Sequence, residues 1–189
     1  MFAGVDLAAS PRGVSGVVVL EQGRGGAARL LACAEARFSD EELLELLTLH
    51  GPPAAVVFDA PLWGGEAVDG FRPVERLVLR LGGRLLPLKL ASMRALARRG
   101  LRLAARVKVF SEVFETHPRS FLRIGGCGVD AVARRLGVDA AALRGCGRHS
   151  LDAFAAAAAA ALLRSGLVYV LAGERFGFLV PLRGLCTRL

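Results

Sequence analysis

Three apolar, strand-like segments open the chain, and the short links between them limit what it can fold into. The segments are residues 1–8, 14–20 and 27–38, and links of only a few residues separate them. Parallel strands need a crossover connection of a dozen or more residues, whereas antiparallel neighbours can be joined by a tight turn. We therefore expect an antiparallel meander of three strands.

A capped helix and a buried strand are predicted next. Ser39 and Glu42 form a capping box, leucines follow, and Gly51 ends the helical pattern. The apolar run at 54–61 lies behind two prolines and is typical of a buried parallel strand. After the meander, a helix is therefore predicted to connect the chain to a parallel strand.

The remaining chain alternates between helical and strand-like patterns. Residues 62–108 are predicted to form a helical excursion, and Ser150 can cap a late helix that carries seven alanines at 155–161. Further expectations are a strand at 109–118, short helices and loops at 118–148, and a final hairpin from "LVYVLAG" and "FGFLV". This order predicts an α/β fold with a mixed sheet and helices on its faces, in a single domain spanning 1–189.

The charge of the chain favours anionic partners. The net charge is +8, and it is carried almost entirely by arginine, because Lys89 and Lys108 are the only lysines. Nucleic acid is the partner that such a charge favours, although a general bias toward arginine would produce the same composition. No long uncharged apolar stretch and no signal peptide are evident, so we expect a cytoplasmic protein without membrane contact.

Four cysteines lie at positions 33, 127, 146 and 186, without the C-x-x-C spacing of zinc sites. In a cytosolic protein we expect them to be reduced and half-buried. A disulfide would need an unusual compartment or a thermophilic host, and Cys127–Cys146 is the pair that we consider for it.

Acidic residues end three of the predicted strands. Asp6, Asp59 and Glu115 hold these positions, and Asp152 lies in the first turn of the late helix. The carboxyl ends of neighbouring strands meet at one edge, where open α/β sheets place their sites. Four clustered carboxylates would repel one another, and a divalent cation that prefers oxygen ligands would remove the repulsion. We therefore predict a metal site for Mg²⁺ or Mn²⁺.

Each acid also has a structural interpretation. Asp6 could cap the turn after its strand, and Asp59 could accept a hydrogen bond from a backbone turn. Glu115 could pair with Arg119, and the helix dipole favours Asp152 near a helix N-terminus. The four positions considered together favour a site.

Four segments together resemble the domain of unknown function 429 family, a predicted nuclease group of the ribonuclease H-like fold. They are "GVDLA" at 4–8, "VVFDAPL" at 56–62, "EVFETHPRSF" at 112–121 and "RHSLDAFAAAAAA" at 148–160. The H-x-x-D-A pattern in the last segment is similar to the last motif of the Holliday-junction resolvases, which share the fold. The resemblance extends to "VP" at 180–181 and so covers nearly the whole chain.

The resemblance implies a five-stranded ribonuclease H-like sheet whose first three strands are antiparallel and whose others are parallel. It also implies metal-dependent hydrolysis of phosphodiester bonds in nucleic acid. Asp6, Asp59, Glu115 and Asp152 are the ligands that it implies for Mg²⁺ or Mn²⁺. A fold carries over from such a resemblance better than an activity does.

Basic residues near these acids are candidates for substrate binding. Arg72 and Arg76 in "FRPVER" and Arg119 in "THPRSF" could hold a phosphate bidentately, although Arg76 and Arg119 could instead pair with the acids. His117 is a further substrate-binding candidate. Either His117 or His149 could donate a proton to a leaving group, orient an acid or be structural.

A metal-dependent nuclease is the function that these patterns favour. One alternative is a nucleotide-binding phosphotransferase of the sugar-kinase and actin-like group, with "DLAASPRG" as its phosphate loop. Such proteins duplicate the core, and 189 residues hold one copy. The second alternative function is a non-catalytic nucleic-acid-binding domain. The sequence does not choose between DNA and RNA, and it leaves the oligomeric state, a homodimer included, undetermined.

Overall fold

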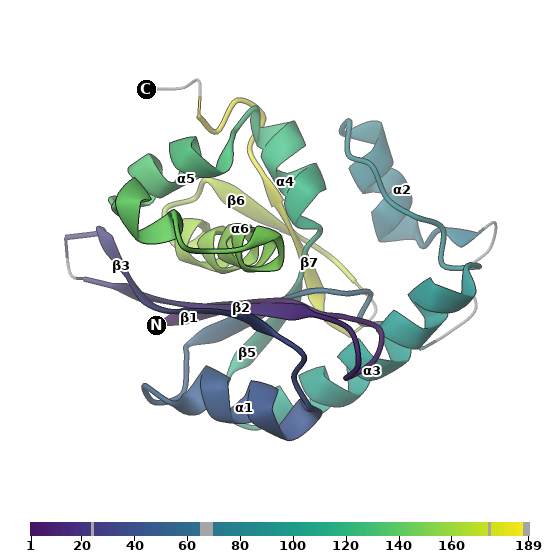
Figure 1. Cartoon of the computed structure of the whole chain (residues 1–189). Coiled ribbons are helices and arrows are strands. Elements are labelled where there is room, and N and C mark those ends of the chain that lie inside the picture. Colours follow the sequence, from purple (N-terminus) through teal and green to yellow (C-terminus); the bar gives the residue numbers. More distant parts are fainter. Residues whose placement is uncertain (24, 65–69, 174, 187–189) are drawn as a thin grey trace.

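A mixed seven-stranded sheet forms the centre of the computed structural model, which describes residues 1–23, 25–64, 70–173 and 175–186 (Figure 1). The strands are β1 Phe2–Asp6, β2 Ser15–Gln22, β3 Ala28–Ala36, β4 Ala55–Asp59, β5 Glu112–Glu115, β6 Val168–Leu171 and β7 Gly177–Pro181. Their order across the sheet is β3-β2-β1-β4-β5-β7-β6.

The pairing confirms the predicted meander and the mixed sheet. β1, β2 and β3 are antiparallel neighbours, whereas β4 pairs parallel to β1 and β5 pairs parallel to β4. This is the arrangement that the resemblance to ribonuclease H-like proteins implies for the first five strands. The predicted count of five strands is too low, because the C-terminal hairpin joins the sheet: β7 pairs parallel to β5, and β6 pairs antiparallel to β7. The hairpin thereby covers an edge that would otherwise leave backbone groups unpaired.

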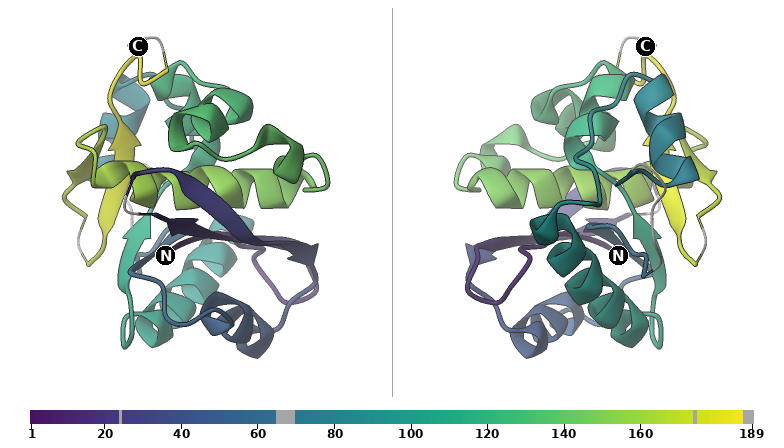
Figure 2. Two further views of the ribbon diagram at one scale, coloured as in Figure 1. Left: turned by 90° about the vertical axis from the view of Figure 1, so that its left-hand side faces the viewer. Right: turned by 90° about the vertical axis from the view of Figure 1, so that its right-hand side faces the viewer.

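Helices cover both faces of the sheet (Figure 2). On one face α6 packs with α4 and α5, and on the other α1 packs with α3. The capping box predicted from Ser39 and Glu42 is present at the start of α1. The helices are α1 Asp40–Thr48, α2 Pro73–Arg80, α3 Ala91–Val107, α4 Pro118–Gly125, α5 Val129–Leu136, a 3₁₀ turn at Ala140–Leu143 and α6 Arg148–Leu163.

The predicted helical excursion at 62–108 contains α2 and α3, and its residues 65–69 lie outside the described part. α3 packs on the sheet through Leu103, Ala104 and Val107, whereas α2 packs against α4 and β7. Within the described ranges, every helix is too short or too polar to cross a bilayer.

Small residues let α6 lie directly on the sheet. A Cβ atom at Gly4 of β1 would lie 2.0 Å from the carbonyl oxygen of Ala153, and one at Gly16 of β2 would lie 2.2 Å from that of His149. Such separations are far inside van der Waals contact, so a larger residue would push the helix away. The alanine tract of α6 is buried against the strands. The first turn of α6 is therefore held beside the carboxyl end of β1.

The start of α6 differs from the prediction. Gly147 is the N-cap residue and the helix begins at Arg148, whereas Ser150 lies inside the first turn. The hydroxyl of Ser150 donates a hydrogen bond to the carbonyl of Ala34 on β3, at 3.1 Å. Its side chain therefore bonds to a neighbouring strand, whereas the sequence predicted that it would cap its own helix.

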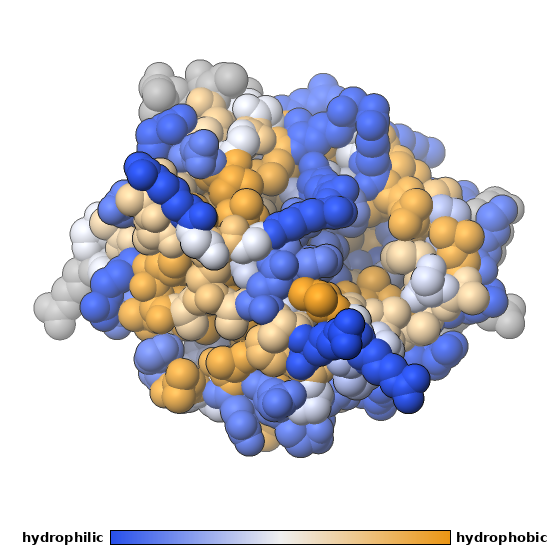
Figure 3. Space-filling model, in the orientation of Figure 1, coloured by the Kyte–Doolittle hydropathy of each residue, from blue (hydrophilic) through white to orange (hydrophobic). Residues whose placement is uncertain are grey.

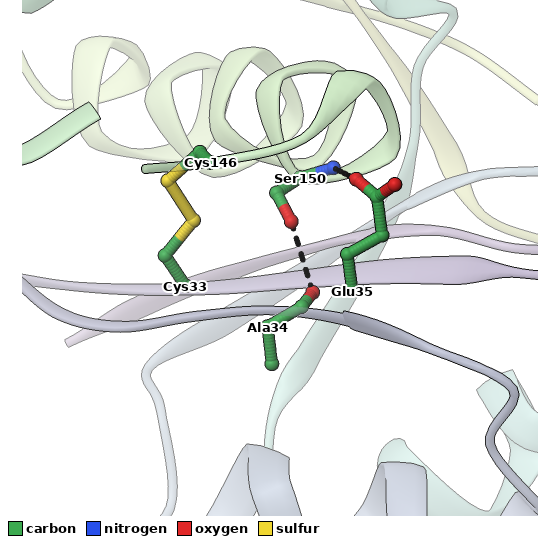
Figure 4. The surroundings of a disulfide bond; sticks show 5 residues. All are labelled: Cys33, Ala34, Glu35, Cys146 and Ser150. Carbon is green, nitrogen blue, oxygen red and sulfur yellow. Dashed lines mark hydrogen bonds between the residues drawn. A yellow bond between two sulfur atoms is a disulfide. The ribbon is translucent and has the colours of Figure 1, made fainter. Parts of the chain in front are cut away.

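Two disulfides contradict the prediction of four reduced cysteines. Cys33 pairs with Cys146 and Cys127 pairs with Cys186, so the pair Cys127–Cys146 is also wrong. The partners are 113 and 59 residues apart, and only the fold brings them together. Cys33 on β3 lies beside the loop that leads into α6, as Figure 4 shows.

Candidate active site

Two aspartates end neighbouring central strands side by side. Asp6 on β1 and Asp59 on β4 are direct register partners. Adjacent strands lie about 4.8 Å apart, and partners in a parallel pair point to the same face. This face is the one that α6 covers, because Phe2, four residues before Asp6, and Val57, two residues before Asp59, belong to its core. The sheet therefore sets two carboxylates next to each other.

The first turn of α6 adds a third carboxylate to this place. Asp152 lines the same cavity of about 630 Å³ as Asp6 and Asp59. The close packing of α6 on Gly4 brings it there, since a wider helix–sheet spacing would move it away from the strand ends. The other described residues of the lining are Arg84, Leu85, Leu86, His117, Arg119, Arg123, Arg148 and His149.

The three acids differ in the side chains that contact their carboxylates. Nδ1 of His149 donates a hydrogen bond to Oδ2 of Asp6, at 2.7 Å. Nε of Arg119 lies 3.6 Å from Oδ2 of Asp152, so the alternative that Arg119 pairs with an acid is confirmed. Among the described residues, no group donates a hydrogen bond to the half-buried carboxylate of Asp59.

The electrostatics of the cavity disfavour three charged acids. Burial raises the pKa of Asp59 well above its ordinary value, and the charges of Asp6 and Asp152 raise it further. Burial also raises the pKa of Asp6, and its bond with His149 opposes that shift only in part. The fold therefore concentrates negative charge here at a cost that a bound cation would relieve.

Glu115 lies at the same edge but on the opposite face. It is the register partner of Phe58, whose side chain belongs to the core under α1 and α3. Its carboxylate accepts hydrogen bonds from Nη1 of Arg72, at 3.0 Å, and from the backbone N–H of Leu62, also at 3.0 Å. Burial raises the pKa of Glu115 and Arg72 opposes the shift. The suggestion that Glu115 pairs with Arg119 is therefore wrong.

Arg72 is a structural residue of this edge. It is 6% exposed, and Nη2 donates to Oε1 of Glu75, at 2.8 Å, as well as to Glu115. Binding of a phosphate would require this buried guanidinium to leave both carboxylates, so substrate binding by Arg72 stays a prediction. Arg76 is exposed on α2 and is not among the described residues that line the cavity.

His117 caps α4 and also lines the cavity. Its Nδ1 accepts a hydrogen bond from the backbone N–H of Ser120, at 3.1 Å. Burial lowers the pKa of His117 to about 4, and the charge of Arg119 adds to the shift. The ring is therefore neutral at physiological pH, in keeping with the structural interpretation of this residue.

Three arginines of the cavity were not foreseen. Arg84, Arg123 and Arg148 line it together with Arg119. Arg123 could have been found, because it follows Arg119 by four residues and so lies on the same face of α4. Its Nε donates to the carbonyl of Gly82, at 2.8 Å, which ties the loop after α2 to α4. Figure 3 shows hydrophilic residues in a band between α4 and α2, with apolar surface on either side.

The start of α6 is fastened to β3 by three contacts that Figure 4 shows together. The Cys33–Cys146 disulfide is one. The backbone N–H of Ser150 donates to Oε2 of Glu35, at 3.0 Å, and the hydroxyl of Ser150 bonds to Ala34. His149 and Asp152 lie within two residues of Ser150, so these contacts fix the helical end of the cavity.

Two structures of RuvC are among the solved structures that are similar to this chain. One is RuvC of T. thermophilus in complex with a Holliday junction substrate, with a TM-score of 0.49 and 19% sequence identity over 87% of this chain and 95% of that one. The other is a Thermus thermophilus RuvC structure, with a TM-score of 0.45 and 20% identity over the same shares. No protein-family model and no curated protein matches the chain. Membership of the domain of unknown function 429 family therefore stays a prediction.

Proposed function

We propose that this protein is a metal-dependent nuclease that hydrolyses phosphodiester bonds in nucleic acid. The observation that carries the proposal is the cavity in which Asp6, Asp59 and Asp152 meet, bordered by four arginines. Carboxylates at the centre suit a cation, and guanidinium groups at the border suit phosphates. A nuclease needs both at one place.

The donor set fits Mg²⁺ or Mn²⁺. Both ions prefer carboxylate oxygens, and the carboxylate of Asp59 has no hydrogen-bond donor among the described residues. The same residues contain no ready group of three or more His, Cys, Asp or Glu side chains in a metal-binding arrangement. Asp152, now paired with Arg119, would turn toward the ion, and Asp6 would bind it with the carboxylate oxygen that His149 does not hold. When bound, the ion would offset the charge that develops on the reacting phosphate.

His149 is the proposed proton-transfer residue. Its Nδ1 is held by Asp6, which fixes the ring and leaves Nε2 to exchange a proton with a leaving oxygen. The side chain is 38% exposed, so a substrate can reach it. Asp6 would therefore orient His149 as well as bind the ion.

The arginines of the cavity are the proposed phosphate-binding residues. Arg119, Arg123, Arg84 and Arg148 replace Arg72 in this role, because they line the cavity and Arg72 is buried elsewhere. Arg148 and Arg84 are exposed, and no carboxylate holds either guanidinium within the described residues. These groups, together with the net charge of +8, favour a nucleic-acid strand as the substrate.

Glu115 has a different proposed role. Its contacts with Arg72 and Leu62 fix the segment that follows Asp59. Glu115 would therefore hold Asp59 in place from the opposite face of the sheet. A direct role as a metal ligand stays a prediction, since it would require Glu115 to leave Arg72.

The test is a cleavage screen with purified protein on single strands, duplexes, DNA–RNA hybrids and branched junctions. Mg²⁺ or Mn²⁺ should support cutting and a chelator should stop it. Asp59→Asn and Asp6→Asn should each lower the rate by at least about a hundredfold, the scale for losing one strong transition-state contact. Asp130→Asn is the matched control, because Asp130 is exposed on α5 and outside the cavity.

Two results would overturn the proposal. Cutting that survives both substitutions would come from another site or a contaminant. Inactivity on every substrate, with tight binding of ATP, would favour the phosphotransferase.

A further inference from the structure

A second, smaller cavity opens beside the acids. Its volume is about 150 Å³, and it shares Asp6, Asp59, Leu85, Leu86 and His117 with the larger cavity. The rest of its wall is largely apolar, with Met93 and Leu96 from α3 and other residues from β7 and the loop after α2. A cavity lined by arginines and a smaller one with a largely apolar wall therefore meet at the same two carboxylates.

The small cavity has the size of one aromatic ring. An engineered apolar protein cavity of about 150 Å³ holds a benzene molecule. The apolar wall contains Leu85, Leu86, Met93, Leu96 and Phe178. Methionine adapts its shape to the group that it contacts and packs well on aromatic rings. A planar ring is therefore a suitable occupant.

The charges of the small cavity disfavour a phosphate. Its polar lining is Thr116, His117 and four acids, with no Lys or Arg among the described residues. Arg72 holds two of these acids, Glu75 and Glu115, so the carboxylates without an arginine partner here are Asp6 and Asp59. Carboxylates repel phosphate groups, whereas an uncharged ring can enter. The arginines lie in the neighbouring cavity. The two cavities thus match the two ends of a nucleotide, a phosphate and a base.

One exposed leucine marks the boundary between the cavities. Leu86 lines both and is 59% exposed. A base entering the small cavity would cover this apolar side chain, which the protein itself leaves in water.

We propose that the small cavity receives one unpaired nucleobase of a strand whose phosphate lies in the arginine-lined cavity. The proposal rests on the proposed nuclease function and narrows its substrate to strands with an unstacked nucleotide. A base inside a duplex cannot reach a closed pocket. The energy of unpairing and unstacking is smallest for a base that is already unpaired, so such a base enters a pocket most readily. Single strands, bulges and branch points therefore bind better than perfect duplexes.

The test compares two probes that differ by one base. Each is a duplex with a single unpaired residue, a thymidine in one probe and an abasic residue in the other, made in DNA and in RNA-backbone versions. Their phosphates are identical, so any difference in affinity comes from the base. Binding is measured by fluorescence anisotropy in EDTA and in Ca²⁺, without cleavage. The wild-type protein should bind the thymidine probe about tenfold more tightly, which is about 1.4 kcal/mol.

Two variants should abolish this difference. Met93→Trp fills the cavity, and Leu86→Glu makes its entrance charged at an exposed position where folding tolerates the change. Leu90→Trp adds the same ring to an exposed position near Met93 that does not line the cavity, and it should keep the difference. Melting temperatures check that the variants fold.

Equal binding of both probes by the wild-type protein, or a difference that persists in Met93→Trp and Leu86→Glu, overturns the proposal. Absence of binding to either probe overturns it too. The two proposals can fail separately. A protein that discriminates the two probes but never cuts with Mg²⁺ would refute the nuclease proposal alone.

Discussion

Replacing Asp59 by Asn should stabilise the metal-free protein. The substitution keeps the size of the side chain and removes one of three carboxylates from the cavity. In the described residues no donor would be lost, because none bonds to Asp59. Asp6, in contrast, would lose its bond to His149. Asp59→Asn therefore isolates the effect of charge.

The magnitude follows from the register of β1 and β4. Two carboxylates about 5 Å apart repel by about 3 kcal/mol at an effective dielectric constant of about 20. Protonation and solvent relieve part of this repulsion, so we expect a gain of about 1–3 kcal/mol in the free energy of unfolding. A gain of this size raises the melting temperature of a chain of this length by roughly 2–10 °C.

The pH dependence of stability is a second test of whether Asp59→Asn stabilises the metal-free protein. The pKa of Asp59 is raised in the folded state, so between the ordinary carboxyl pKa and the raised value the folded protein binds more protons than the unfolded chain. Metal-free wild-type protein should therefore lose stability as the pH rises through this window. Asp59→Asn should remove that loss.

The assay is a set of thermal melts in chelator and in Mg²⁺, across a pH series. Mg²⁺ at a hundred times its dissociation constant should stabilise the wild-type protein by about 2.7 kcal/mol. Asp59→Asn should respond much less, and the control Asp130→Asn should behave as the wild type. A melting temperature in chelator that falls in Asp59→Asn, with an unchanged response to Mg²⁺, would refute the electrostatic argument.

Three further predictions concern the frame around the cavity. The double change Cys33→Ser and Cys146→Ser should lower the free energy of unfolding by about 2–4 kcal/mol in urea titrations, because it frees a 113-residue loop; equal stability would mean that the disulfide adds nothing. Arg72→Met should cost about 3–5 kcal/mol by the same measurement, because Glu115 is left buried without its partner; a smaller loss in Arg72→Met combined with Glu115→Gln would identify the unpaired charge as the cause. Gly4→Ala should cost about 3 kcal/mol or more in thermal melts, since its methyl group would meet α6; a neutral effect would show that α6 can shift freely.

Features set by neighbouring residues could be predicted from the sequence. The capping box of Ser39 and Glu42 depends on four consecutive residues, and it is present. The antiparallel meander follows from two short links, and it too is confirmed. Asp6 and Asp59 were placed near the ends of the strands predicted at 1–8 and 54–61, and the observed strands stop at these two residues, two positions earlier than predicted.

Features set by register or by distant contacts could not be predicted. β5 has four residues, too few for its pattern to show which face Glu115 would take. Arg72 and Glu115 are 43 residues apart, and their ion pair depends on how α2 packs. The cysteine pairs span still longer separations. Ser150 was expected at the cap because its type suits that position, but Ala34 on β3 offers its hydroxyl an acceptor.

The central claim is that Asp6, Asp59 and Asp152 bind a catalytic cation. A crystal soaked in Mn²⁺ and measured at the manganese absorption edge tests it most directly, because the anomalous signal identifies the ion and its position. The account predicts an anomalous peak bounded by carboxylate oxygens of these three residues, at about 2.0–2.6 Å from them, and no such peak in Asp59→Asn. A crystal that binds Mn²⁺ elsewhere and leaves this cavity without a peak would contradict the account.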